Sequence, residues 1–360
     1  MEAVTWEQVL AWRLRRQFLD PVAGGDPVEV ARRLAGVQAQ VASAAELAIA
    51  LRQADPAPGA VAAAIAGRRL VKTWAMRGTL HLLPADEAAA YLALSGAHRN
   101  WERGSWQKTF GATPADLEAI AAAASDALSG GATLSREELT AEIVDRTGSA
   151  HLAEVLGSGW GTLLKPLAWW KVLCFGPPRG NRVTFVGAGW LPEARDPAAT
   201  VLRAYLGAHG PTTPELFDKV WLSRGVTPRA RLKGWFAALG DELTEVDVEG
   251  ERRVMLAEHV AELAATPPSR AVRLLGAFDA YVLGAGTTAT EIVPAERRAA
   301  VSRSGGWISP VVLCGGRVAG VWDGDATTLW EDVPEDALAA ERARLASATA
   351  ALSQEPGPAR

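Results

Sequence analysis

Residues 70–83 read Leu70-Val-Lys-Thr-Trp-Ala-Met-Arg-Gly-Thr-Leu-His-Leu-Leu83, two short apolar runs that meet at Arg77-Gly78. Short runs rich in Val, Thr and Trp on either side of a turn signal predict a β-hairpin. The chain before this hairpin has apolar residues at every third or fourth position, which predicts helices. These predicted helices cover residues 5–17, 26–35, 43–53 and 58–67. Helices followed by a short hairpin form the plan of a winged-helix unit.

The same plan recurs twice further along the chain. A second copy has predicted helices at 135–147 and 152–167, then predicted strands at 170–175 and 182–186. A third copy has predicted helices at 197–209, 212–223 and 227–239, then predicted strands at 243–247 and 252–256. The hairpins lie roughly 70 to 100 residues apart, a spacing looser than that of a solenoid and typical of tandem small domains.

The texture of the chain changes after Pro267-Pro268. Predicted strands cover residues 271–283, 307–314 and 317–322, and a predicted helix covers residues 334–350. We therefore expect an α+β fold of three tandem winged-helix units followed by a small β-barrel-like domain. The expected parts are 1–110, 111–195, 196–268 and 269–333, with a C-terminal helix and tail at 334–360. We expect the tail from Gln354 onward to be disordered.

Composition narrows the class of protein. The 360 residues are 49% hydrophobic and 22% charged, which is typical of a globular protein. The sequence has no apolar run of about 20 residues and no signal-like start, so we expect no membrane contact and a cytoplasmic location. Cys174 and Cys314 have no further cysteine or histidine at metal-ligand spacing, so we expect no metal and no cofactor.

The net charge of −4 argues at first against a nucleic-acid partner. Basic residues nevertheless gather in the N-terminal third of the chain, and acidic residues gather near the C-terminus. Because a charged surface acts over about one Debye length, local clusters matter more than the sum. Charge alone leaves DNA binding open.

Four segments, in this order, resemble the family of the bacterial AlkZ and YcaQ DNA glycosylases. They are Gly36-Val-Gln-Ala-Gln40, Trp74-Ala-Met-Arg-Gly-Thr-Leu-His81, Ala204-Tyr-Leu-Gly-Ala-His-Gly-Pro-Thr-Thr213 and Leu274-Leu-Gly-Ala-Phe-Asp-Ala-Tyr-Val-Leu-Gly284. The resemblance implies three winged-helix units and monofunctional hydrolysis of the N-glycosidic bond to alkylated purines, interstrand crosslinks included. In the AlkZ-like branch this activity often protects producers of DNA-alkylating natural products.

The family signature is a glutamine, one intervening residue, then glutamine or aspartate. Its match here assigns the catalytic role to Gln38 and Gln40 and places the chain in the AlkZ-like, glutamine–glutamine subgroup. One segment departs from the family pattern: Gly284-Ala-Gly-Thr-Thr-Ala-Thr290 lacks the charged residues expected in a loop that faces DNA. This departure bears on which adduct the protein recognises.

Two neutral glutamines suit one particular chemistry. Positions two apart on a helix point about 200° away from each other, whereas on an extended segment they share a side. Gln38 and Gln40 lie between two predicted helices, so an extended segment would direct both toward one water, with Val37, Ala39 and Val41 toward the core. An N3- or N7-alkylated purine is already cationic and leaves without an enzyme acid. The other interpretation is two polar residues on an interhelical surface.

Eight basic residues are candidates for contact with double-stranded DNA that carries alkylated purines. We expect the hairpins to reach phosphates or the minor groove, and the basic run of the last domain to enter a groove. The candidates are Lys72, Arg77 and His81 on the first hairpin, Arg179 and Arg182 on the second, and Arg297, Arg298 and Arg303 further on. The alternatives are solvated wing residues and, for His81, a buried histidine with satisfied hydrogen bonds. Asp279, within an apolar run, we expect to be buried with a structural partner.

Two other functions remain open. A non-catalytic winged-helix regulator would also suit tandem wings, but such proteins usually dimerise to read paired half-sites. The sequence shows no heptad pattern, so we expect a monomer, associated with the nucleoid when bound to DNA. A protein that sequesters the alkylating drug is the third hypothesis, and it would not need the two glutamines.

Overall fold

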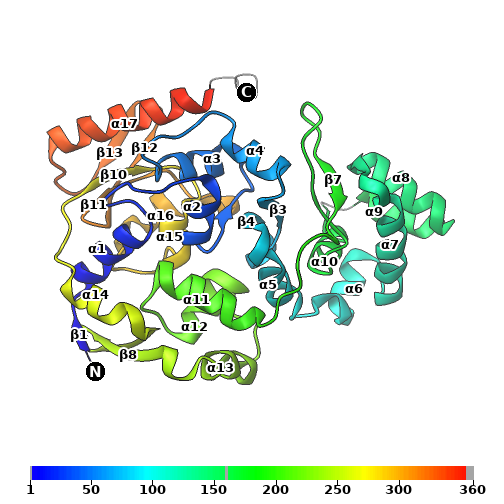
Figure 1. Ribbon diagram of the computed structural model, residues 1–360, viewed down its shortest axis with the longest axis horizontal. Coiled ribbons are helices and arrows are strands. Elements are labelled where there is room, and N and C mark those ends of the chain that lie inside the picture. The colour runs from blue at the N-terminus through cyan, green and yellow to red at the C-terminus, as the bar shows by residue number, and fades with distance from the viewer. Residues whose placement is uncertain (1, 159–160, 354–360) are drawn as a thin grey trace. The chain divides into compact units, whose positions relative to one another are not determined.

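The computed structural model describes residues 2–158 and 161–353 (Figure 1). The predicted tail from Gln354 lies outside the described residues. The chain forms two compact units. Residues 1–61 and 199–360 form one, the outer unit, and residues 62–198 form the other, the inserted unit. The division of the chain into five parts stays a prediction.

The inserted unit is built around a sheet of antiparallel strands in the order β4-β3-β6-β7-β5. These strands are β3 (Leu70–Trp74), β4 (Leu80–Pro84), β5 (Thr133–Ser135), β6 (Leu173–Phe175) and β7 (Thr184–Gly187). The helices of this unit are α5 (Ala85–Gly96), α6 (Gly104–Phe110), α7 (Pro114–Ala127), α8 (Arg136–Thr147), α9 (Ala150–Ser158) and α10 (Leu164–Trp169), while α4 (Ala60–Ala66) spans the boundary. Both predicted hairpins are therefore confirmed, and the single helix predicted at 152–167 is wrong: two helices stand there.

Aromatic side chains fill the core of the inserted unit. Trp74 meets Phe175 edge to face, with ring centroids 4.7 Å apart, and stacks on Phe185 at 6.0 Å. Such pairs contribute about 0.5–1.5 kcal/mol beyond the area they bury. Trp74 is thus a core residue of the first hairpin, held by the two strands of the second.

The outer unit is formed by two segments that are far apart in the sequence. Its N-terminal elements are β1 (Glu2–Val4), α1 (Trp6–Arg16), α2 (Pro27–Arg33), β2 (Val37–Gln38) and α3 (Ala42–Ala50). After the insertion follow α11 (Pro197–His209), α12 (Pro214–Leu216), a π-helix (Phe217–Leu222), α13 (Arg229–Ala237), β8 (Leu243–Val248), β9 (Glu251–Leu256) and α14 (Val260–Ala265). β1 pairs in parallel with β8, so the third predicted hairpin gains a strand from the start of the chain.

A four-stranded antiparallel sheet replaces the predicted barrel. The order is β10-β11-β12-β13, formed by β10 (Val272–Leu275), β11 (Val311–Cys314), β12 (Arg317–Asp323) and β13 (Ala326–Leu329). In the described ranges, β10 and β13 do not pair with each other, so the sheet stays open and the barrel-like prediction is wrong. The remaining helices are α15 (Ala280–Ala285), α16 (Arg298–Val301) and α17 (Glu335–Ser353).

The strand predicted at 271–283 is wrong in its second half. The strand β10 ends at Leu275, and Phe278 then has a left-handed backbone, with φ of 59°, in the turn before α15. The Asp279 side chain then accepts a hydrogen bond from the backbone of Tyr281 and caps α15. The apolar pattern of 271–283 is real, but it belongs to a strand, a sharp turn and a helix.

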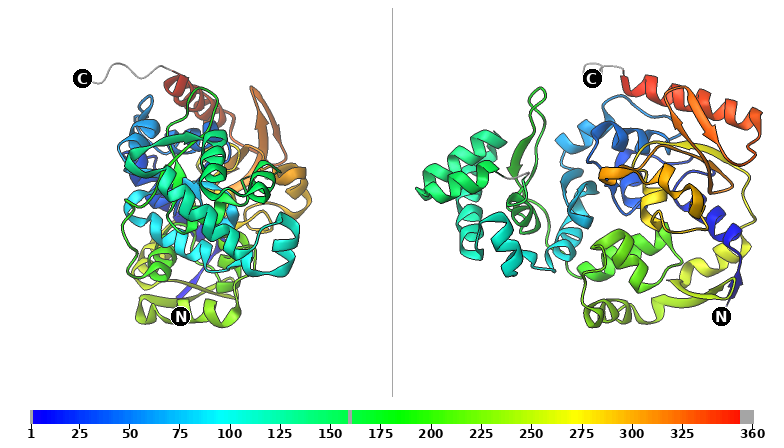
Figure 2. Two further views of the ribbon diagram at one scale, coloured as in Figure 1. Left: turned by 90° about the vertical axis from the view of Figure 1, so that its right-hand side faces the viewer. Right: turned by 180° about the vertical axis from the view of Figure 1, so that it is seen from behind.

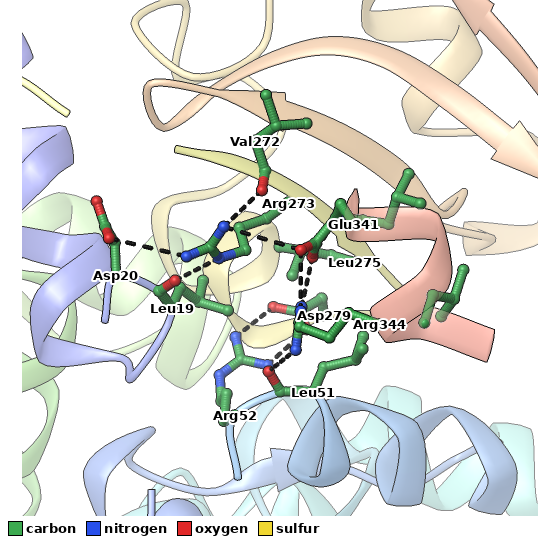
Figure 3. A network of polar contacts seen from close by, with 12 residues as sticks. Leu19, Asp20, Leu51, Arg52, Val272, Arg273, Leu275, Asp279, Glu341 and Arg344 are labelled. Carbon is green, nitrogen blue, oxygen red and sulfur yellow. Dashed lines mark hydrogen bonds and ion pairs between the residues drawn. The ribbon is translucent and has the colours of Figure 1, made fainter. Parts of the chain in front are cut away.

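A buried polar network fixes α3 to the sheet of the outer unit (Figure 3). Arg52, just after α3, donates two hydrogen bonds of 2.7 and 2.8 Å to the carboxylate of Asp279, and both side chains are almost fully buried. Glu341 of α17 accepts from the backbone of Leu274 at 3.1 Å and from Arg344. Helix α17 runs along β10 and α3 (Figure 2). The structural partner expected for Asp279 is thus Arg52.

Candidate active site

The glutamine segment leaves helix α2 through a Schellman turn. The backbone N–H of Gly36 donates to Ala31 at 2.8 Å, and that of Ala35 donates to Arg32 at 3.1 Å. This turn requires a left-handed residue after the helix cap, and Ala35 takes that conformation with φ of 57°. A left-handed alanine costs about 1–2 kcal/mol. The turn reverses the chain immediately before the two glutamines.

Gln38 and Gln40 lie on one side of the chain that follows. Val37 and Gln38 form β2, and Val41 is extended, with φ of −108° and ψ of 110°. Exposure alternates: Val37 and Ala39 are buried, at 2% and 1%, while Gln38 is half-buried and Gln40 is exposed. Because successive side chains of an extended segment alternate, both glutamines point away from the core. This alternation agrees with the extended segment expected from the sequence, although Val41 is half-buried rather than in the core. That both amides face one water stays a prediction.

A neutral histidine supports the turn from behind. His209, at the end of α11, accepts a hydrogen bond from the Gln17 side-chain amide on Nδ1 at 3.2 Å, so its Nε2 carries the proton and donates to the Leu34 carbonyl at 3.3 Å. Burial lowers the pKa of His209 to about 3, against a smaller opposite effect of the bond to Leu34. The sequence did not single out His209, because neither its partners nor its burial is local.

The space around His209 depends on a glycine. A Cβ atom on Gly284 would lie 2.2 Å from the His209 ring, so no larger residue fits there. The Tyr205 hydroxyl donates to the Gly284 carbonyl at 3.0 Å. Gly284, the first residue of the uncharged segment 284–290, is therefore packed inside the outer unit.

The first hairpin carries three of the predicted DNA contacts. Lys72 is half-buried on β3, and Arg77 is half-buried at the hairpin tip, where its φ is 56°. His81 is 3% exposed, and its Nδ1–H donates to the Thr79 carbonyl at 3.0 Å. Burial, helped by the charge of Arg77, lowers the pKa of His81 to about 3. These observations favour the alternative of a buried, neutral histidine for His81.

The second hairpin presents its two arginines at an exposed loop. Arg179 and Arg182 pair through their backbones across this loop, whose residues 177–183 are all exposed. The guanidinium of Arg179 forms an ion pair with Glu138, which also holds the pKa of that carboxyl below its ordinary value. Arg182 is thus the better placed of the two for a contact with phosphate.

The basic run of the outer unit lies on one short helix and the turn after it. Arg297 and Arg298 are exposed at the start of α16, and Arg303 is exposed in the turn 302–308. Arg297 lies over the Trp330 ring, 5.7 Å from its centroid. The sequence missed Trp307 in this turn, which is 41% exposed and packs edge-on against Phe278 at 4.9 Å. The local pattern that could have pointed to Trp307 is Gly305-Gly306, which predicts a turn directly before this aromatic residue.

The described ranges contain no cluster of three His, Cys, Asp or Glu side chains that could hold a metal ion. The helices among them include none that is long and apolar enough to cross a membrane. Burial raises the pKa of Cys174 to about 12, so this thiol stays protonated. In the segment 37–41, the polar side chains are the amides of Gln38 and Gln40.

Comparison with known proteins points to one family. The sequence matches the model described as DNA glycosylase AlkZ-like over residues 31–354. An interstrand DNA cross-link repair glycosylase of Streptomyces sahachiroi is 49% identical over 327 residues, which are 89% of this chain and 88% of that protein. The solved structure of Streptomyces sahachiroi DNA glycosylase AlkZ has a TM-score of 0.91 and 45% identity and covers 99% of each chain. The chain belongs to the AlkZ-like DNA glycosylase family.

Proposed function

We propose that this protein is a monofunctional DNA glycosylase that hydrolyses the N-glycosidic bond of N3- and N7-alkylated purines, bulky adducts and interstrand crosslinks included. The observation that carries the proposal is the Gln38–Gln40 pair, which lies on the outward side of an extended segment within the part of the chain that matches the family. The relative from Streptomyces sahachiroi, named for crosslink repair, supports the substrate class. The protein acts as a monomer on double-stranded DNA.

The two glutamines position the attacking water. Each amide offers one carbonyl acceptor and two N–H donors, so a water between Gln38 and Gln40 can donate to both carbonyls and keep a lone pair toward the sugar. The amides add no charge and are weak bases. The positive charge of the alkylated purine supplies the driving force instead, because the base leaves as a neutral molecule. Normal purines and uracil lack that charge, so this pair does not release them.

The backbone geometry before the motif makes the pair rigid. The Schellman turn at Ala35 and the bond from His209 to the Leu34 carbonyl set the direction in which the chain enters β2. The Arg52–Asp279 pair holds the far end of α3. A water is oriented best by groups that need no rearrangement when it attacks.

DNA binding rests on exposed cations. Arg182 and Arg179 on the second hairpin, and Arg297, Arg298 and Arg303 on α16 and its turn, contact phosphates. Lys72 on β3 and Arg77 at the tip of the first hairpin add to these contacts, and the buried His81 supports that hairpin from within. In this proposal the hairpins β3–β4, β6–β7 and β8–β9 are the wings of three winged-helix units.

The test uses four duplexes that differ at one base: N7-methylguanine, a guanine–guanine N7 crosslink, uracil and an undamaged control. We expect free base and alkali-labile sites from the first two only. No enzyme should be trapped on DNA by borohydride, because no lysine lies in the motif to form a Schiff base. Binding of all four duplexes without base release from any would contradict the glycosylase and favour a DNA-binding regulator.

A further inference from the structure

The segment that ends the π-helix and continues through α13 is strongly basic. Residues 219–240 contain five lysines and arginines and no aspartate or glutamate. These cations are all exposed: Lys219, Arg224, Arg229, Arg231 and Lys233. Within the described ranges, no carboxylate forms an ion pair with Arg224, Arg229 or Lys233. Helix α13, which carries three of the five, lies on the outside of the outer unit in each view (Figure 1, Figure 2).

A buried carboxylate fixes the turn that carries Arg224. Asp218, 3% exposed, accepts hydrogen bonds from the hydroxyls of Ser223 and Thr227 and from the Thr227 backbone at 3.1 Å. Arg224, which is exposed, has a left-handed backbone in this turn, with φ of 65°. These hydrogen bonds hold Ser223 and Thr227, the residues on either side of Arg224-Gly-Val226, to one buried carboxylate.

The helix and the hairpin of this unit carry opposite charges. The β8–β9 hairpin contains four acidic residues and two arginines, and both arginines already pair with hairpin carboxylates, Arg252 with Glu245 and Arg253 with Glu251. A polyanion is repelled by this wing and attracted by α13. In a DNA-binding helix-turn-helix, the second helix is the one that meets the duplex.

The residues between the cations indicate how α13 binds. Arg229 and Lys233 are four positions apart and share one face of the helix. The other exposed residues of α13 are Ala230, Arg231, Gly234 and Ala237, which include no amide or hydroxyl side chain, so any reading of bases by this helix falls to its arginines and lysines. Cations set among small residues suit close contact with a sugar–phosphate backbone of any sequence.

We propose that Arg224, Arg229 and Lys233 form a second DNA-binding surface, separate from the glutamine segment, that holds the phosphate backbone of duplex DNA without sequence preference. This inference rests on the proposed DNA substrate. The surface lets the enzyme stay on undamaged duplex while it searches for a lesion. It contributes to affinity and leaves the hydrolytic step unchanged.

The experiment compares Arg224→Gln/Arg229→Gln/Lys233→Gln with the wild-type full chain on an undamaged duplex between 50 and 200 mM salt. Each lost phosphate contact lowers the slope of log affinity against log salt by about 0.9, so the triple variant should lose about 2.7. At about 100 mM salt its affinity should fall at least tenfold. Single-turnover base release from N7-methylguanine DNA at saturating protein should stay within about twofold of wild type.

Two controls make the result specific. Arg15→Gln/Arg270→Gln/Arg342→Gln removes the same charge from exposed arginines elsewhere in the outer unit and should keep the wild-type slope. Arg224→Lys/Arg229→Lys keeps the charge and should also keep the wild-type slope. Circular dichroism checks that each variant is folded. An unchanged slope in the triple glutamine variant would contradict the binding of DNA by this surface. An acidic protein would then be the partner to seek. Absence of base release even in wild type contradicts the proposed function but not the surface, which the binding slope tests by itself.

Discussion

Ala35 is the residue on which the geometry of the glutamine segment depends most directly. It is fully buried and left-handed, a conformation that glycine adopts without strain and a β-branched residue adopts only at high cost. Its hydrogen bond to Arg32 and that of Gly36 to Ala31 set the exit of the chain from α2. The position of Gln38 is therefore determined three residues earlier.

Substitution of this residue tests that dependence. Ala35→Val should destabilise the fold by about 2–4 kcal/mol, because strain and overpacking add. It should also slow base release from N7-methylguanine DNA more than it weakens DNA binding. Ala35→Gly is the matched control and should keep the wild-type rate. Urea unfolding and single-turnover kinetics give both quantities; equal rates for the two variants would contradict the role of the turn.

At the scale of elements, the Arg52–Asp279 pair joins α3 to the turn before α15. Both side chains are buried, and Arg52 also donates to the Ala48 carbonyl at 2.8 Å. Loss of one partner leaves a buried charge without its counter-charge, which costs about 3–5 kcal/mol, whereas loss of both can be nearly neutral.

We therefore expect Arg52→Met to lower the free energy of unfolding by about 3–5 kcal/mol. The double variant Arg52→Met/Asp279→Leu should recover part of that loss, although Leu no longer caps α15. Denaturant unfolding of the two variants and wild type measures the difference. A single variant as stable as wild type would show that the pair does not hold these elements together.

Most elements could be predicted from the sequence because their signals are local. Helix α11 spans the predicted residues 197–209, and both strands of the first hairpin lie within a residue or two of their predicted positions. The prediction of one strand at 271–283 failed because β10 ends at Leu275 and the same apolar run continues through a turn at the left-handed Phe278 into α15. The alternation of Val37, Gln38 and Ala39 was predictable from the period of an extended chain, whereas the bond from His209 to Leu34, 175 residues apart in the sequence, was not.

On the scale of the whole molecule, long-range pairing decides which segments fold together. β1 and β8 pair in parallel although more than 200 residues separate them, and the pair belongs to a unit interrupted by residues 62–198. No local sequence pattern predicts such a pairing. Long-range packing also buries His209, whose hydrogen-bond partners Gln17 and Leu34 lie 192 and 175 residues away in the sequence. His81, in the inserted unit, is buried as well.

These two histidines predict the response of stability to pH. In the folded protein each has a pKa of about 3, below the ordinary 6.5. Between those values the unfolded chain binds protons that the folded chain does not, so the free energy of unfolding falls as the pH drops below 6.5. Each histidine accounts for about 2 kcal/mol between pH 7 and pH 5. Urea titrations at both pH values should show the loss, and His209→Gln should reduce it by about half; an equal loss in that variant would contradict the assignment.

The most direct test of the account is the single-turnover rate of N7-methylguanine release by wild type and by Gln38→Ala/Gln40→Ala, with affinity for the same duplex measured alongside. If the two amides orient the water, the double variant should bind DNA within about threefold of wild type and release base at least about 100-fold more slowly, a loss of about 2.7 kcal/mol in the transition state. Release at the wild-type rate by the double variant would contradict the role given to these glutamines.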